Sequence, residues 1–169
     1  MKASGTRYWA LLLALVMTLP AITAHAECLD APAAGVDWER CYFDGNDLRG
    51  ATLSNANLRD ATFSRADLSE ADFSGANAFR VKFISAKLEN AVFDGARLDE
   101  ADFTKADLRG ASFRGARLRR ARLFDADLRG ADLTGANIRN ADLLGAYLAG
   151  ATWIDGQRIC AEGSRGQCG

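Results

Sequence analysis

A five-residue repeat runs without a break from Cys41 to Asp155, and it constrains the fold more than any other feature of the sequence. The repeat comprises 23 consecutive units, and we call the third residue of each unit its centre. Leu or Phe occupies 20 of the 23 centres, and Ala occupies the first position in 20 of the 23 units. Such regularity indicates one small structural unit that is repeated many times.

A period of five fits neither an α-helix nor one long strand. On a helix, successive centres would drift by roughly 140° per unit, which leaves no amphipathic face. In a strand, the period of two would send alternate centres to opposite faces. A short strand followed by a turn fits: the first and third residues point inward, the second points outward, and the last two turn the corner. The fifth residue is Gly in ten units and Asn or Asp in six, and these residues tolerate a positive φ.

The pattern Ala-(Asp/Asn)-Leu-x-x, seen in residues 106–110, resembles that of the pentapeptide-repeat proteins. The resemblance covers about two-thirds of the chain. It implies that family's all-β fold, a right-handed quadrilateral parallel β-helix with four units per coil and here about six coils. Ala78 is a small centre followed by the bulkier Val81, so we expect a local distortion of the coil there.

The chain is predicted to consist of four segments. Residues 1–26 have the features of a signal peptide: basic residues at the start, an apolar run from Tyr8 to Leu19, and a small-x-small site that ends at Ala26. We predict cleavage after Ala26 and a periplasmic or secreted product without a membrane span; an uncleaved anchor is the alternative. Residues 27–40 are predicted to be an N-terminal cap, 41–155 the β-helix, and 156–169 a C-terminal cap closed by cysteines.

All four cysteines lie at the two ends of the repeat array: Cys28, Cys41, Cys160 and Cys168. In an oxidising compartment they are expected to form disulfides, for which three connectivities exist. We favour Cys28–Cys41 and Cys160–Cys168, because six stacked coils would hold the two ends roughly 25–30 Å apart. A zinc site is the competing interpretation, but the one histidine, His25, leaves with the signal peptide.

Every fourth unit falls on the same side of such a coil, so the centres form ladders. We predict two opposed aromatic ladders, Phe43, Phe63, Phe83 and Phe103 on one side and Phe73, Phe93 and Phe113 on the other. Leucines fill the two sides between them. So narrow an interior is expected to be a packed core and not a ligand cavity.

Charge is distributed unevenly over the four sides. The side that contains the centre Leu98 has seven arginines against three acids, a balance of +4, whereas the opposite side has a balance of −2. The side is either a solvated surface with local ion pairs or a docking surface for an acidic protein or envelope polymer. We call the seven arginines the Arg face: Arg59, Arg80, Arg97, Arg117, Arg119, Arg120 and Arg139.

A sparse apolar row is predicted on the Phe43 side, at Ile84, Phe124 and Leu144. Scattered exposed apolar residues are common on protein surfaces. The other interpretation of the row is a surface for association between copies of the chain or with a partner.

The sequence favours an interaction module over an enzyme. It offers no catalytic nucleophile–base pair and no cofactor motif. Stacked carboxylates such as Asp107 and Asp127 could bind a hard cation, but they are expected on an open face without a cleft. Without Lys2 and Arg7, 19 of the 21 basic residues remain against 22 acidic ones, so we expect no nucleic-acid partner. The resemblance implies one alternative, a DNA mimic that binds DNA gyrase, but export and the +4 side disfavour it. A secreted effector is the third alternative.

Overall fold

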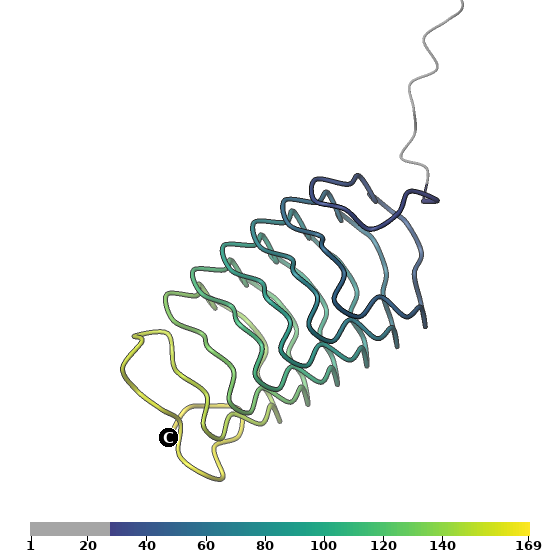
Figure 1. Ribbon diagram of the computed structural model, residues 1–169. Coiled ribbons are helices and arrows are strands. Elements are labelled where there is room, and N and C mark those ends of the chain that lie inside the picture. Colours follow the sequence, from purple (N-terminus) through teal and green to yellow (C-terminus); the bar gives the residue numbers. More distant parts are fainter. Residues whose placement is uncertain (1–27) are drawn as a thin grey trace, which may run out of the picture.

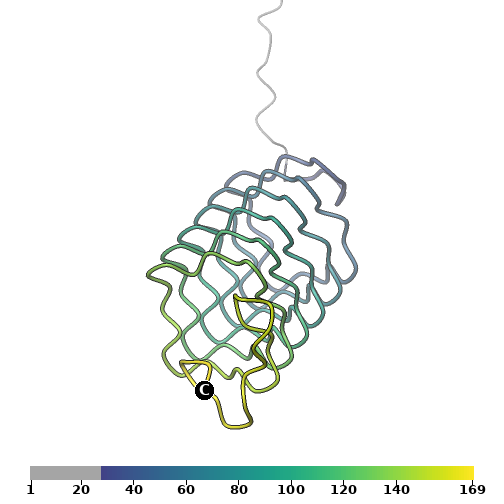
Figure 2. The ribbon, with the colours of Figure 1, turned by 90° about the vertical axis from the view of Figure 1, so that its left-hand side faces the viewer.

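A computed structural model describes residues 28–169 of the chain (Figure 1). They form a right-handed quadrilateral parallel β-helix, whose coils stack along one axis (Figures 1 and 2). The predicted signal peptide, 1–26, lies outside the described residues. Among residues 28–169 there is no helix of the length and apolarity that a membrane crossing needs.

Each side of the coil is a very short strand with a single bridging residue, which occupies the second position of its unit. The bridges are parallel and join residues twenty apart, in an unbroken series from Asp37–Asn57 to Asp132–Thr152. The regular pattern of bridges and turns starts at Val36 and continues to Asp155. At twenty residues per coil, residues 36–155 make six coils.

Backbone hydrogen bonds repeat with the same five-residue period. The centre donates its N–H to the second-position carbonyl one coil further on, as Leu108 does to Asp127 (2.8 Å). The first residue of the next unit closes the corner by donating back to the centre, as Ala111 does to Leu108 (3.1 Å). The coils are therefore joined by backbone ladders along all four sides.

From Gly35 to Gly150, every corner has a left-handed residue at the fifth position. Glycines there have φ values such as 64° at Gly115, and thirteen non-glycine residues take the same conformation, for example Glu70 at 62°. None of the thirteen is β-branched, which agrees with the steric cost of a branched side chain at positive φ.

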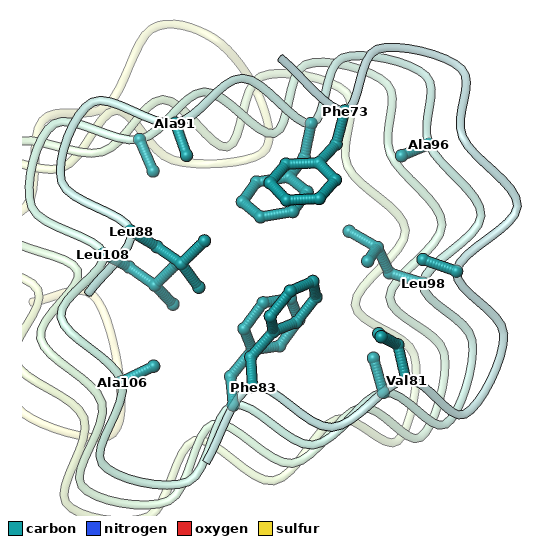
Figure 3. Close-up of a cluster of buried hydrophobic side chains, with 14 of the residues drawn as sticks. Phe73, Val81, Phe83, Leu88, Ala91, Ala96, Leu98, Ala106 and Leu108 are labelled. Atoms are coloured by element: carbon teal, nitrogen blue, oxygen red, sulfur yellow. The ribbon is translucent and has the colours of Figure 1, made fainter. Parts of the chain in front are cut away.

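The interior is filled by the predicted ladders of centres. In Figure 3, Phe73 and Phe83 face each other across the core, and Leu88 and Leu98 approach from the two other sides. Stacked rings run along both aromatic ladders, with centroids 5.4 Å apart for Phe63 and Phe83. The opposed aromatic ladders are thus confirmed.

The distortion expected at Ala78 does not occur. The bridges Asn57–Asn77 and Asn77–Arg97 continue through this coil, and Ala78 donates its usual hydrogen bond to Arg97 (2.9 Å). A small centre is tolerated because the backbone ladders hold the coil in place.

The two ends are closed by different means. At the N-terminal end, Trp38 packs against Phe43 with centroids 4.2 Å apart, and both are buried, at 1% and 6% exposure. At the C-terminal end the chain turns back on the last coil as two antiparallel bridges, Tyr147–Arg165 and Thr152–Ile159. The cysteines form the two predicted pairs: Cys28 with Cys41 (Cα atoms 5.5 Å apart) and Cys160 with Cys168 (4.8 Å).

Candidate partner-binding face

The β-helix places the seven arginines of the Arg face on one side, because they occur at corresponding positions of units that are four apart. Arg97 and Arg117 are bridged second-position neighbours. The other five occupy the fourth and fifth positions, at the adjoining corner: Arg59, Arg119, Arg139, Arg80 and Arg120. The arginines of this face that form ion pairs have side chains that remain partly exposed to solvent.

A buried carboxylate lies in the middle of this face. Asp99 occupies a fourth position but is only 3% exposed. Its Oδ1 accepts a hydrogen bond from Arg119 Nε (2.8 Å), and its Oδ2 lies 2.9 Å from Arg117 Nη2 and 3.6 Å from Arg97 Nε. No N–H is directed at Oδ2 well enough to form a hydrogen bond. One carboxylate thus holds three guanidinium groups together, and the group keeps a net positive charge.

Phe79 provides an aromatic surface next to this cluster. Three guanidinium groups, those of Arg59, Arg80 and Arg97, lie 5.3, 4.9 and 5.2 Å from its ring centroid. Cation–π contacts at such distances stabilise a guanidinium and restrict its movement. The arginines are therefore held in fixed positions by an aromatic ring on one side and a carboxylate on the other.

The other two acids of the face, Asp60 and Glu100, each form ion pairs with arginines. Asp60 lies 2.7 Å from Arg80 Nε and 3.4 Å from Arg59 Nε, and Glu100 lies 3.6 Å from Arg120 Nη1. The hydrogen bond from Arg80 is the main reason that the pKa of Asp60 is lowered. Among the described residues, Arg139 has no carboxylate within ion-pair distance.

A hollow of about 270 Å³ opens beside Asp99. It forms where the short side chain of Asp99 lies between the larger fourth-position side chains of Phe79 and Arg119. Its lining is Phe79, Arg97, Asp99, Glu100, Arg119, Arg120, Arg139 and Asn140. Four arginines around one hollow can bind an oxyanion by charge and by directed N–H groups.

On the opposite side, each arginine pairs with the acid two residues before it in its own unit. Arg109 hydrogen-bonds Asp107 two residues before it (2.7 Å) and also reaches Glu89 (3.3 Å). The bond from Arg109 lowers the pKa of Asp107. Arg49 lowers the pKa of Asp47 to about 2 in the same manner. Each of these arginines is paired with a neighbouring acid, whereas the arginines of the Arg face outnumber the acids on that side.

Second-position acids have a structural role that the sequence analysis missed. The fourth-position N–H has no backbone acceptor in the repeating pattern, and the second-position carboxylate accepts it instead, as Asp72 does from Ser74 (2.8 Å) and Asp132 from Thr134 (2.9 Å). Asn137 does the same for Arg139. The preference for Asp and Asn at the second position is visible in the sequence and could have indicated this role.

The apolar row is narrower than its sequence suggests. Ile84 and Phe124 are half-buried, and only Leu144 is largely exposed, at 67%. The fourth position is partly covered by the corner, so its side chains do not all face solvent. Within residues 28–169 no group of three or more potential metal ligands was found.

Comparison with known proteins agrees with this architecture. The family model for pentapeptide repeats matches eight copies, over residues 33–60, 47–83, 79–115 and 116–152. No curated protein sequence matches the chain significantly.

Several solved structures are similar to the chain. One is HetL from the cyanobacterium Nostoc sp. strain PCC 7120, a pentapeptide repeat protein involved in heterocyst differentiation regulation. It is 34% identical to this chain, the match covers 75% of this chain and 62% of HetL, and the TM-score is 0.54. Another is Rfr23 from the cyanobacterium Cyanothece 51142 (27% identity, 69% and 90% coverage, TM-score 0.40). A third is QnrB1, a plasmid-mediated fluoroquinolone resistance protein, with 23% identity over 71% of this chain and 64% of QnrB1 and a TM-score of 0.40. The chain thus spans less than two-thirds of the length of HetL. The chain belongs to the pentapeptide repeat family.

Proposed function

We propose that the chain is an exported, non-enzymatic β-helical module that binds an acidic partner through the Arg face. The observation that carries the proposal is the convergence of Arg97, Arg117 and Arg119 on buried Asp99, beside a hollow lined with further arginines. A buried acid that holds three guanidinium groups in place preorganises them, and preorganised donors lose less entropy on binding.

The chemistry of arginine favours a carboxylate or phosphate as the bound group. A guanidinium presents several N–H donors in one plane and pairs with such anions in bidentate geometry. Among the described residues, Arg119 uses only its Nε in a hydrogen bond to Asp99, so its Nη groups are free for an external acceptor. Arg139 at the rim is similarly free of an acidic neighbour.

Retention on immobilised poly-L-glutamate tests the proposal. The variant Arg120→Glu/Arg139→Glu changes two rim residues and leaves the three partners of Asp99 in place. The control Arg49→Glu/Arg129→Glu makes the same change in net charge on the opposite side. We expect the rim variant to elute at lower salt than the parent and the control to elute close to it. Equal elution of the two variants would show that the face is only a solvated side.

Reversal of Arg97, Arg117 and Arg119 is a poor test, although these residues define the cluster. It would leave the buried carboxylate of Asp99 among three new acids, and an unpaired buried charge is strongly destabilising. The rim variants avoid this, and their thermal unfolding provides a check on folding.

Export is tested separately, because it rests on residues 1–26. N-terminal sequencing of the protein from a periplasmic or secreted fraction should begin at Glu27. A cytoplasmic protein that still begins at Met1 would contradict export. The DNA-mimic alternative requires strongly negative sides, and the +4 balance of the Arg face opposes it.

A further inference from the structure

The C-terminal tail covers only half of the last coil. On two sides it takes the place of a seventh coil, both donating and accepting the backbone hydrogen bonds that the next coil would supply. Cys160 donates to Ala151 (2.9 Å) and Gly166 to Ala146 (2.9 Å). In the other direction, Leu148 donates to Ser164 (3.0 Å), Gly150 to Cys160 (2.9 Å) and Trp153 to Arg158 (2.7 Å). Figure 2 shows the yellow tail folded against this end.

The other two sides of the last coil have an open edge. Within residues 28–169 the N–H groups of Ile138, Asn140 and Leu143 have no backbone acceptor, and the carbonyls of Ala136 and Ala141 have no backbone donor. One coil earlier, Leu118 donates to Asn137 (2.9 Å) and Leu123 to Asp142 (2.7 Å). We call residues 136–143 the open edge.

The core is also incompletely covered at this edge. Leu118 and Leu123 are fully buried, but Ile138 and Leu143, the next centres in the same two ladders, are only partly buried. At the N-terminal end the corresponding centres, Trp38 and Phe43, are buried. An exposed strand edge beside exposed apolar centres is a site at which another extended chain can pair.

We propose that the open edge receives an extended acidic segment of a partner protein, which adds to the β-helix as a strand. The charge around the edge selects the occupant, because Arg139 and Asn140 belong both to the open edge and to the lining of the hollow. Carboxylates of an added strand would lie near Arg119, Arg120 and Arg139. The inference rests on the proposed function and specifies the chemistry of the partner.

A second copy of the chain fits the open edge less well. Its first coil carries suitable acids, Asp37 and Glu39. In a stack that continues the coil, however, its residues 46–55 would have to occupy the level already filled by the tail over Leu148 and Trp153. The tail itself shows that this end accepts an antiparallel strand, at Tyr147 and Thr152.

The test measures binding of a fluorescent peptide of alternating Glu and Val by the mature protein. Matched probes are the same peptide with its backbone nitrogens methylated and a peptide of alternating Lys and Val. The variant Ile138→Pro removes an N–H that has no acceptor within the described chain, so it breaks no internal hydrogen bond. Tyr42→Pro is its control at the N-terminal end, where the N–H likewise has no acceptor among the described residues.

We expect Ile138→Pro and backbone methylation each to weaken binding at least about tenfold, since each removes strand hydrogen bonds. Tyr42→Pro should leave binding unchanged, and the Lys peptide should not bind. In the unmodified protein, amide hydrogen exchange at Ile138, Asn140 and Leu143 should slow when the Glu peptide is added. This measurement decides the matter even if a proline variant fails to fold.

Four results would overturn the inference. Equal binding of the methylated peptide, with retention on poly-L-glutamate intact, would leave the proposed function standing without a strand at the edge. Equal binding of the Lys peptide would remove the acidic partner. Self-association that Ile138→Pro abolishes would make a second copy the occupant. If the unmodified protein neither binds the Glu peptide nor is retained on poly-L-glutamate, the proposed function is refuted as well.

Discussion

The rings of Phe73 and Phe93, twenty residues apart, stack with centroids 4.8 Å apart and planes within 5° of parallel. This is the usual spacing of hydrogen-bonded strands, about 4.8 Å, so the aromatic ladder repeats at the spacing of the backbone ladder. The opposed ladders meet edge to face, with the Phe83 and Phe93 centroids 5.8 Å apart at 71°. Backbone and core therefore stabilise the same register, and each coil packs mainly on its two neighbours.

Leu108→Asp should destabilise the protein by at least about 4 kcal/mol and prevent folding, because it places an unpaired charge in the interior of a central coil. Leu108 is fully buried. Lys105→Asn, at an exposed corner with φ 58°, is the control and should change stability by less than about 0.5 kcal/mol. Chemical denaturation measures both. Arg109 is unsuitable as a control, because it pairs with Asp107 and Glu89. Equal damage from the two substitutions would mean that the inward and outward positions are misassigned.

Glu70→Gly should stabilise the fold by up to about 1 kcal/mol, because Glu70 has a φ of 62° and a side chain at positive φ is strained. The reciprocal change, Gly95→Ala, should destabilise by a similar amount. Nothing lies within 4 Å of the methyl group it would add, so the effect reports conformation and not a clash. The free energy of unfolding of both variants gives the answer, and equal signs for the two would contradict the corner geometry.

Stability should fall as the pH is lowered from about 4 towards 2. Arginines and serines lower the pKa of several carboxyls, those of Asp47, Asp60, Asp67, Asp107 and Asp127, and Asp47 reaches about 2. A lowered pKa means that the folded chain binds protons less tightly than the unfolded chain. The resulting stability is complete above the ordinary aspartate pKa of about 3.9 and is lost as pH falls through the folded values.

Thermal melts between pH 7 and pH 2 measure this dependence. Asp47→Asn and Asp107→Asn remove two of the titrating groups, so the melting temperature of these variants should fall less steeply between pH 4 and pH 2. A melting temperature that stays constant down to pH 2 would contradict the ion pairs described above.

The protein, denatured without reductant, should contain no free thiols, and peptide mapping should link Cys28 to Cys41 and Cys160 to Cys168. Opening the first of these, with a sequence separation of 13, should cost about 3 kcal/mol. Thiol labelling and mass spectrometry are the measurements. A peptide that joins the two ends of the rod would contradict the pairing.

The sequence was sufficient to predict the coil, because inward and outward positions follow from a strictly local period. Phe73 and Leu108 could be placed from their position in the unit alone. The burial of Asp99 could not, because it depends on Arg117 and Arg119 reaching it from the next coil. The second-position Asp72 was expected only to face outward, and its hydrogen bond to Ser74 was missed because the orphan N–H is visible only in the backbone pattern.

The ends were harder to predict than the middle. The regular pattern already begins at Val36, five residues before the boundary predicted at Cys41. Trp38 stands five residues before Phe43, in the register of the centres, but Val36 replaces the usual Ala and no Leu or Phe marks the unit. The tail from Gln157 onward has no repeat, so its antiparallel course and the half of the last coil that it leaves open come from non-local pairing.

The twenty-residue register also governs what insertions and deletions do to such a protein. Removal of a whole coil, such as residues 61–80, would shorten the rod and return every downstream side to its place. Removal of a single unit, such as 101–105, would keep every inward residue inward but turn the downstream part by a quarter. Arg119 and Arg139 would then lie on a different side from Asp99. Gain or loss of single units can thus rearrange a surface completely while the core sequence pattern stays the same.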